Sequence, residues 1–123
     1  MKEIKTTNAP AAIGPYSQAI ISGNLVFTSG QIPVNPENGE IPCGVEAQAH
    51  QVFKNIKNLL EAAGSDISRV IKTSVFIQDM NDFAKINEIY ASYFTEPFPA
   101  RSCVEVAKLP KGVLLEVEAV AEI

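Results

Sequence analysis

Runs of apolar residues, separated by turn residues, predict a series of short β-strands. The segments at residues 16–22 and 25–29 are separated only by Gly23-Asn24, a pair typical of a tight turn between antiparallel strands. Residues 3–7 allow a short strand before them, and residues 30–44, rich in proline and glycine, indicate a long loop. Further strands are predicted at residues 70–77, 100–107 and 113–121.

Two other segments carry apolar residues at the spacing of an amphipathic helix. The first covers residues 45–63 and is followed by Gly64, which commonly ends a helix. The second covers residues 82–94, where Asp82 or Asn81 can cap the first turn. This order of elements predicts an α+β fold, a two-layer sandwich of one mixed sheet with two helices on one face, formed by a single domain over residues 1–123.

The predicted strands are apolar on both faces, although two helices can cover only one face of a sheet. In the strand at residues 25–29, Leu25 and Phe27 are expected to face opposite to Val26. In the strand at residues 70–77, Val70 and Phe76 are expected to face opposite to Ile71, Val75 and Ile77. An uncovered face of this kind would be a large exposed apolar patch. Assembly with further copies of the chain is the favoured solution, and a strongly twisted sheet that closes partly on itself is the alternative.

Composition narrows the classes of function. The chain has 123 residues, of which 46% are hydrophobic and 20% charged, enough for one domain with a core. The net charge of −4, without a cluster of Lys or Arg, disfavours binding to a nucleic-acid backbone. Cys43 and Cys103 form neither a metal-binding pattern nor a disulfide framework. No signal-peptide pattern or membrane-length apolar run is present, so a soluble, reduced, cytoplasmic protein is expected.

Several common kinds of active site are disfavoured by what the chain lacks. The single histidine, His50, falls on the charged face of the first predicted helix, opposite its apolar stripe. A solvated surface histidine cannot serve a Ser-His-Asp or Cys-His system. No group of residues is spaced to bind a metal ion, and no glycine-rich phosphate loop is present. No metal or cofactor is therefore expected, and arginine, carboxylates, hydroxyls and backbone groups remain.

Arg101 is the most informative of these residues. It is one of two arginines, and it follows Pro99-Ala100 at the entrance of an apolar strand. A guanidinium group binds carboxylate or phosphate through a planar fork of donors, so Arg101 is a candidate anion site. A structural ion pair, or a surface position at a strand end, is the alternative. Strand alternation places Cys103 and Glu105 on the same side as Arg101.

Glu116 and Glu118 share one face of the last predicted strand. A pair of this kind is often a solvated strand edge, which is the alternative to a functional role. The turn at residues 109–112 suggests a hairpin that would bring Glu116 near Arg101, although the sequence does not reveal the register.

Three polar residues complete the set of candidates. Asn87 falls among the aromatic residues of the second predicted helix, where a buried amide would either tie down a loop or contact a ligand. Tyr16 and Ser29 are hydroxyl residues close to glycines, at positions where the backbone can approach a ligand.

Taken together, several segments resemble one known family. They are N-A-P-A-A-I-G-P-Y-S-Q-A, F-T-S-G-Q-I-P-V-N-P, E-A-A-G, V-F-I-Q-D-M-N-D-F, and F-P-A-R-S-C-V-E-V-A-K-L-P-K-G followed by L-E-V-E-A-V-A. They are similar to the Rid family, the reactive intermediate deaminases of the RidA/YjgF type, over essentially the whole chain. The P-A-R-S-x-V block with L-E-V-E downstream is the most specific part.

The resemblance implies a chorismate-mutase-like α+β sandwich that forms a homotrimer, with sites in the clefts between subunits. It also implies hydrolysis of enamine and imine acids, such as 2-aminoacrylate and 2-iminobutanoate, to 2-oxo acids and ammonia. Arg101 would bind the substrate carboxylate, and Glu116 would orient or activate water. The residues expected to line or support the pocket are Tyr16, Ser29, Gly30, Asn87 and Cys103, the last through its backbone.

Residues 93–98 form a short proline-containing segment, so the loop that enters the site is expected to differ in detail from longer relatives. Two other functions stay open: a regulatory module that binds small acids without turnover, and an RNA-cleaving translation inhibitor, a role also attached to this family. Binding to nucleic acid and to membranes is not expected.

Overall fold

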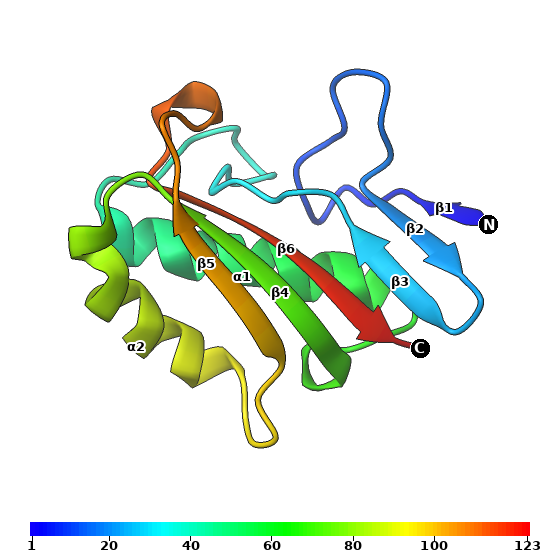
Figure 1. Cartoon of the computed structure of the whole chain (residues 1–123). Helices are drawn as coiled ribbons and strands as arrows, with labels where there is room; N and C mark the ends of the chain where they lie inside the picture. Colours follow the sequence, from blue (N-terminus) through cyan, green and yellow to red (C-terminus); the bar gives the residue numbers. More distant parts are fainter.

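The computed structural model describes all 123 residues and contains one six-stranded sheet with two α-helices (Figure 1). The elements are β1 (Lys2–Ile4), β2 (Ala19–Ser22), β3 (Leu25–Thr28), α1 (Val45–Ala62), β4 (Val70–Ile77), α2 (Phe83–Tyr93), β5 (Ala100–Glu105) and β6 (Leu115–Glu122), with short 3-10 turns before β4, α2 and β6. The predicted order of elements and the α+β class are confirmed.

The first two strands are shorter than expected, because the chain around Tyr16 is a loop. Gln18 is buried, and its side-chain amide donates to the carbonyls of Thr6, Ala9 and Pro10 while its oxygen accepts from the N–H of Thr6. These bonds satisfy loop backbone groups that a strand would have paired with a neighbouring strand.

The order of strands in the sheet is β1-β2-β3-β6-β4-β5. The β4–β5 pair is parallel, and the other neighbouring strands run antiparallel. The predicted hairpin between the last two strands is therefore wrong. A parallel pair needs a crossover connection, here α2, which returns the chain to the outer edge of β4. The following turn then takes β6 to the other edge of β4, so β4 separates β5 from β6.

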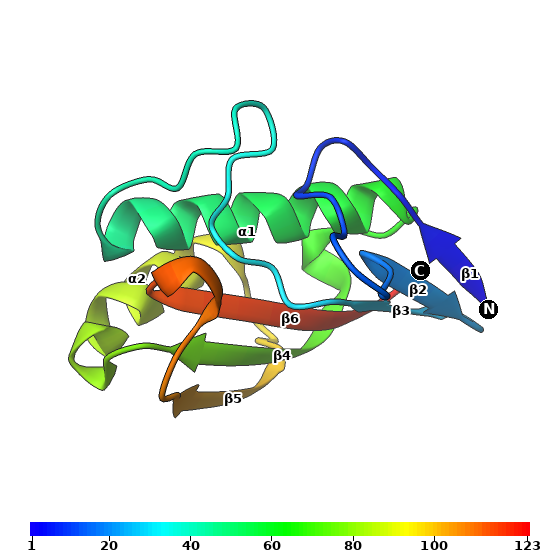
Figure 2. The same ribbon diagram turned by 90° about the horizontal axis from the view of Figure 1, so that it is seen from above.

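The core lies between α1 and one face of the sheet. Figure 2 shows α1 along one side of the strands and no helix along the other. The largest fully buried side chains of α1 include Phe53, Ile56 and Leu59, which belong to the same cluster as Leu115 and Val117 of β6. Successive side chains of a strand point to opposite faces, so only every second residue of β6 reaches this core. This explains why apolar residues occupy every second position of β6.

A β-bulge near the start of β4 changes which side chains share a face of this strand. The register against β6 shifts between Val70 and Lys72, which adds a residue to β4. Val70 is therefore buried on the helix side with Val75, whereas Ile71 is exposed. The prediction that Val70 shares a face with Phe76, and Ile71 with Val75, is wrong for this reason.

Buried amides hold the long loop before α1 in place. Asn55 of α1 is fully buried and donates to the carbonyls of Ile32 and Val34. Gln48, about two turns earlier on the same face of α1, donates to the carbonyl of Pro42 and accepts from the N–H of Leu114. These bonds position the segment that follows β3, which carries Gly30.

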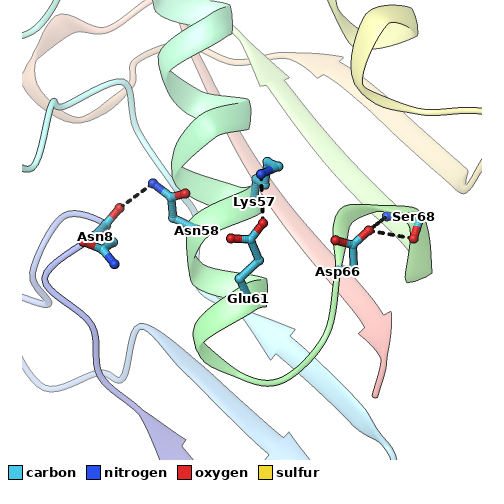
Figure 3. Close-up of polar contacts among 6 residues, drawn as sticks. All are labelled: Asn8, Lys57, Asn58, Glu61, Asp66 and Ser68. Carbon is cyan, nitrogen blue, oxygen red and sulfur yellow. Dashed lines mark hydrogen bonds and ion pairs between the residues drawn. The ribbon is translucent and has the colours of Figure 1, made fainter.

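Polar contacts on the outer side of α1 hold the neighbouring loops (Figure 3). Asn58 donates to the carbonyl of Asn8, which links the N-terminal loop to the helix. Lys57 and Glu61 form an exposed ion pair at 2.8 Å, and Asp66 caps the 3-10 turn that precedes β4. Exposed ion pairs contribute little to stability, so little is expected from the Lys57–Glu61 pair.

The second face of the sheet is open. It carries Phe27 and Val104, which are 43% and 47% exposed, together with a hydrogen bond from Lys72 to Ser102. The two-sided apolar pattern noted in the sequence is therefore present in the structure. No helix of the structure has the length and hydropathy needed to span a membrane.

Candidate functional site

Arg101 lies on β5 with its side chain on the helix side of the sheet. Its guanidinium carbon is 4.8 Å from the ring centroid of Tyr90 and 5.5 Å from that of Phe83. Its Nη1 donates to Oδ1 of Asn87 at 2.8 Å. These three partners all come from α2, at positions i, i+4 and i+7, so they form one face of that helix. The cation is held on an aromatic surface by one side-chain hydrogen bond.

The alternative of a structural ion pair for Arg101 is wrong, because Arg101 forms no salt bridge with any carboxylate of the chain. It lines a cleft of about 380 Å³ together with Asn87, Tyr90, Phe98 and Pro99. One guanidinium N–H is used by Asn87, and the others are available for a bidentate anion such as a carboxylate.

Asn87 and Cys103 take positions beside the arginine. Asn87 is exposed and accepts from Arg101, so the expectation of an amide that ties down a loop is replaced by a contact with the guanidinium. Cys103 follows on the same side of β5 and is half-buried. Burial raises the pKa of the Cys103 thiol, and nearby Arg101 only partly offsets this. The thiol therefore stays protonated near neutral pH and is a poor nucleophile.

Glu116 lies on β6 with its side chain on the open face of the sheet. The carboxylate rests against Gly30, so closely that a Cβ atom at position 30 would overlap it. A bridge between Gln31 and Val117 places Gly30 beside β6. Burial raises the pKa of the Glu116 carboxyl, and the charge of Glu118 raises it further. A solvated strand edge does not describe this half-buried group.

Tyr16 and Ser29 lie in the loops next to Gly30. The Ser29 hydroxyl donates to the carbonyl of Ser17 at 2.6 Å, and the Tyr16 hydroxyl accepts from the N–H of Ile13 at 3.3 Å. Tyr16 and Gly30 both line a second cavity of about 510 Å³. Gly30 therefore links these loops to Glu116, because it follows Ser29 in the chain, shares the cavity with Tyr16 and lies against the Glu116 carboxylate, which itself does not line the cavity.

The candidate residues thus form two separate groups. The Arg101 group consists of Asn87, Arg101 and Cys103, and the Glu116 group consists of Tyr16, Ser29, Gly30 and Glu116. In the strand register, Arg101 pairs with Thr73, which faces the helices, whereas Glu116 pairs with Phe76, which faces the open side. The expected approach of Glu116 to Arg101 within one chain is therefore wrong.

Two parts of the site were missing from the sequence analysis. The face of the Tyr90 ring lies against the guanidinium, and Phe98 lines the cleft. The aromatic spacing of α2 was visible in the sequence, but nothing local indicated that α2 lies over β5. Phe94 of the same stripe packs against Phe53 in the core instead.

The remaining titratable side chains do not gather into a further centre of this kind. No three of the His, Cys, Asp and Glu side chains converge in a way that could hold a metal ion. His50 is exposed, as expected, and its Nδ1 is 3.1 Å from the Tyr93 hydroxyl on the outer side of the helices.

The two-helix sandwich and these residues define a class of protein, and similarity to known sequences and solved structures identifies that class. The family model described as Endoribonuclease L-PSP matches residues 6–123. The chain belongs to this family, that of the YjgF/RidA or Rid proteins. It is 57% identical over 123 residues to the 2-iminobutanoate/2-iminopropanoate deaminase of Escherichia coli K12, covering 98% of this chain and 96% of the relative.

Solved structures show the same similarity. The crystal structure of Escherichia coli TdcF with bound serine matches with a TM-score of 0.95 and 51% identity, over 100% of this chain and 99% of that chain. RidA from an Antarctic Psychrobacter species matches with a TM-score of 0.97 and 47% identity, over 100% of both chains.

Replacing Glu118 should lower the pKa of Glu116. Glu118→Gln keeps the size of the side chain and removes one of the two causes that raise this pKa, so Glu116 will lose its proton at a lower pH. Carboxyl-detected NMR titration of the parent and the variant measures the change. Glu122→Gln, at the far end of the same strand, is the matched control and should leave the titration unaltered. An unchanged Glu116 titration in Glu118→Gln would contradict the assignment.

Proposed function

We propose that this chain is a 2-iminobutanoate/2-iminopropanoate deaminase, which hydrolyses reactive imine acids to 2-oxo acids and ammonia. The imines arise by tautomerisation of enamines such as 2-aminoacrylate. The observation that carries this proposal is the Arg101 guanidinium, held by Asn87 and Tyr90 with donors left for a small acid. The name of the 57% identical relative from Escherichia coli K12 supports the same reaction.

Arg101 is proposed to bind the substrate carboxylate. A guanidinium matches a carboxylate through two parallel N–H bonds, which fixes orientation as well as position. The neighbouring imine carbon is then held in one place, so water can attack it along a defined direction. Arg101 and Asn87 are exposed in the single chain, so a second copy that covers the cleft would strengthen the electrostatic attraction compared with bulk water.

Glu116 is proposed to activate the water. Water adds its oxygen to the carbon of the protonated imine, and Glu116 accepts the proton that this oxygen loses. The carboxyl then gives this proton to the nitrogen, and the resulting carboxylate takes the remaining hydroxyl proton as the carbonyl forms, the C–N bond breaks and ammonia leaves. Ammonia takes up that proton, so the charge that entered with the protonated imine leaves as ammonium. The raised pKa of Glu116 brings it closer to neutral pH, which suits a group that both accepts and donates a proton. Cys103 is not used as a thiolate in this scheme.

Substrate can meet both groups only if two copies of the chain meet. Within one chain, Arg101 and Glu116 lie on opposite sides of the sheet. The open face, with exposed Phe27 and Val104, is the surface that a second copy would cover. We therefore propose a homotrimer with sites between subunits, where the number three comes from the Rid resemblance. We also propose that residues 1–123 act as one Rid-type domain in the cytoplasm, a setting that suits two free cysteines.

Light scattering at micromolar concentration should give the mass of about three chains, because closed cyclic assembly covers the open face of every copy. The Phe27→Glu variant places a charge on that face and should shift the equilibrium to single chains. Ile13→Glu, which places the same charge at an exposed position of the N-terminal loop, is the matched control. A well-behaved single chain at the same concentration would contradict the intersubunit site.

RNA cleavage is the second candidate, because the matching family model carries the description endoribonuclease. The net charge of −4 and the position of His50, away from both groups, give it little support. A regulatory module that only binds acids is the third candidate, and it would not need Glu116. No nucleic-acid or membrane partner is proposed.

Replacement of Arg101 should mainly weaken the binding of acids, whereas replacement of Glu116 should mainly lower kcat. Arg101→Ala removes the partner of the carboxylate and should weaken binding of both substrate and inert 2-oxobutanoate by about 30- to 3,000-fold. Glu116→Gln keeps the shape and should leave 2-oxobutanoate binding within about tenfold while lowering kcat by about 10²- to 10⁴-fold. Calorimetric titration and release of 2-oxo acid from freshly generated 2-aminoacrylate measure the two effects.

The control for these variants is Arg69→Ala, which removes the other arginine of the chain, a residue bonded to backbone carbonyls near the end of β6. It should bind 2-oxobutanoate like the parent. Normal turnover by Glu116→Gln would contradict the water-activating role of Glu116 and leave that work to the substrate's own groups. Acid binding without turnover by the parent would favour the regulatory module, and degradation of RNA by the parent without imine turnover would favour the second candidate.

A further inference from the structure

We infer that Thr73 is a positioning residue for Arg101, and that it acts through Tyr90. This inference rests on the proposed role of Arg101 as the carboxylate site. Thr73 does not contact the cleft itself, because it is fully buried in β4. Its hydroxyl lies 2.8 Å from the hydroxyl of Tyr90, and Tyr90 lies directly against the guanidinium.

The sheet places Thr73 and Arg101 side by side. The two residues pair in the parallel register of β4 and β5, so both side chains point to the helix layer. The Tyr90 ring lies over this pair, with its hydroxyl end at Thr73 and its face at Arg101. One ring therefore connects a fixed core hydroxyl to the group that would bind substrate.

The Tyr90 ring is otherwise surrounded by apolar neighbours. It is 5% exposed, and it packs edge-on against Phe53 with 5.6 Å between the ring centroids. The Phe94 ring lies tilted against it, with 4.4 Å between the centroids. A phenol hydroxyl in such a place needs a hydrogen-bond partner, and Thr73 is the partner that the structure provides. Burial also raises the pKa of Tyr90, so the ring stays neutral and keeps its hydroxyl proton.

The position of the ring decides how well it supports the guanidinium. Attraction between a cation and an aromatic ring depends on the cation lying over the face of the ring. Asn87 fixes one nitrogen of the guanidinium, but a single hydrogen bond leaves rotation about that bond free. The ring removes this freedom, so the remaining donors point into the cleft before substrate arrives. Preorganisation of this kind raises affinity by reducing what must be ordered on binding.

A purely structural role for the Thr73–Tyr90 bond predicts a different result. Loss of a buried hydrogen bond would lower thermal stability and leave the affinity of the folded protein for acids unchanged. The positioning role predicts weaker binding of a carboxylate by protein that is fully folded and assembled. Acid affinity therefore separates the two, whereas the melting temperature alone does not.

The test is a double-mutant cycle with 2-oxobutanoate as the probe, measured by titration calorimetry. Thr73→Val, which has the same shape without the hydroxyl, should weaken binding by about three- to tenfold, and Tyr90→Phe by about threefold. The double variant should bind no more weakly than Thr73→Val alone, because both ends of the hydrogen bond are then apolar. In imine turnover, KM should rise with little change in kcat. Thr73→Ser should restore most of the affinity.

The matched control is Tyr93→Phe, which removes a hydroxyl from the same helix, where it contacts His50 rather than Arg101. It should bind the probe like the parent. The inference is overturned if Thr73→Val and Tyr90→Phe both bind 2-oxobutanoate normally, or if the two losses multiply in the double variant. If the parent itself neither binds the probe nor hydrolyses the imine, the proposed function fails as well. Should Thr73→Val not assemble, Tyr90→Phe and Thr73→Ser decide the question.

Discussion

Strand β4 is the constraint on which the rest of the site depends. It lies between β5 and β6, so Arg101 and Glu116 reach opposite faces of the sheet from strands that are not neighbours. The crossover through α2 makes the β4–β5 pair parallel and sends Arg101 to an outer edge, where the helix layer supplies its partners. The cation and the carboxylate that the proposed reaction needs are thereby kept apart in each chain. The fold supplies both halves of a site, and assembly is proposed to join them.

The neighbours of Arg101 and of Glu116 set the charge and position of each side chain. Arg101 has no carboxylate partner in the chain, and it is held instead by aromatic rings and one amide. This arrangement fixes the guanidinium without neutralising it, so its charge remains available for an incoming acid. Glu116 is held in the space that Gly30 leaves free, beside Glu118, and both surroundings raise its pKa. The proposed anion receptor and the proposed proton-transfer group therefore come from residues that lie apart within one chain.

The sequence was informative where the chemistry is local. Apolar spacing predicted the helix at residues 45–63 and the strands, and the alternation in L-E-V-E-A-V-A predicted the side-chain faces of β6. Arg101 was recognised by its unusual place at the entrance of a strand. The failures concern contacts between distant segments. The order of strands was misjudged because a short turn before β6 looked like a hairpin, and the faces around Val70 and Ile71 because a bulge leaves no mark in the pattern. The support of Arg101 by Tyr90 depends on the same long-range arrangement, and so does the contact of Glu116 with Gly30.

The most direct test of the shared site is to combine two inactive variants. Arg101→Ala chains and Glu116→Gln chains are unfolded together, refolded as a mixture and assayed for imine hydrolysis. If each site takes Arg101 from one copy and Glu116 from another, random assembly restores both residues in about a quarter of the sites, and activity should recover to about that fraction of the parent. The same two proteins, mixed after separate refolding, are the control and should stay inactive until subunits exchange. Activity of the refolded mixture no higher than that of the control would contradict a site built from two chains.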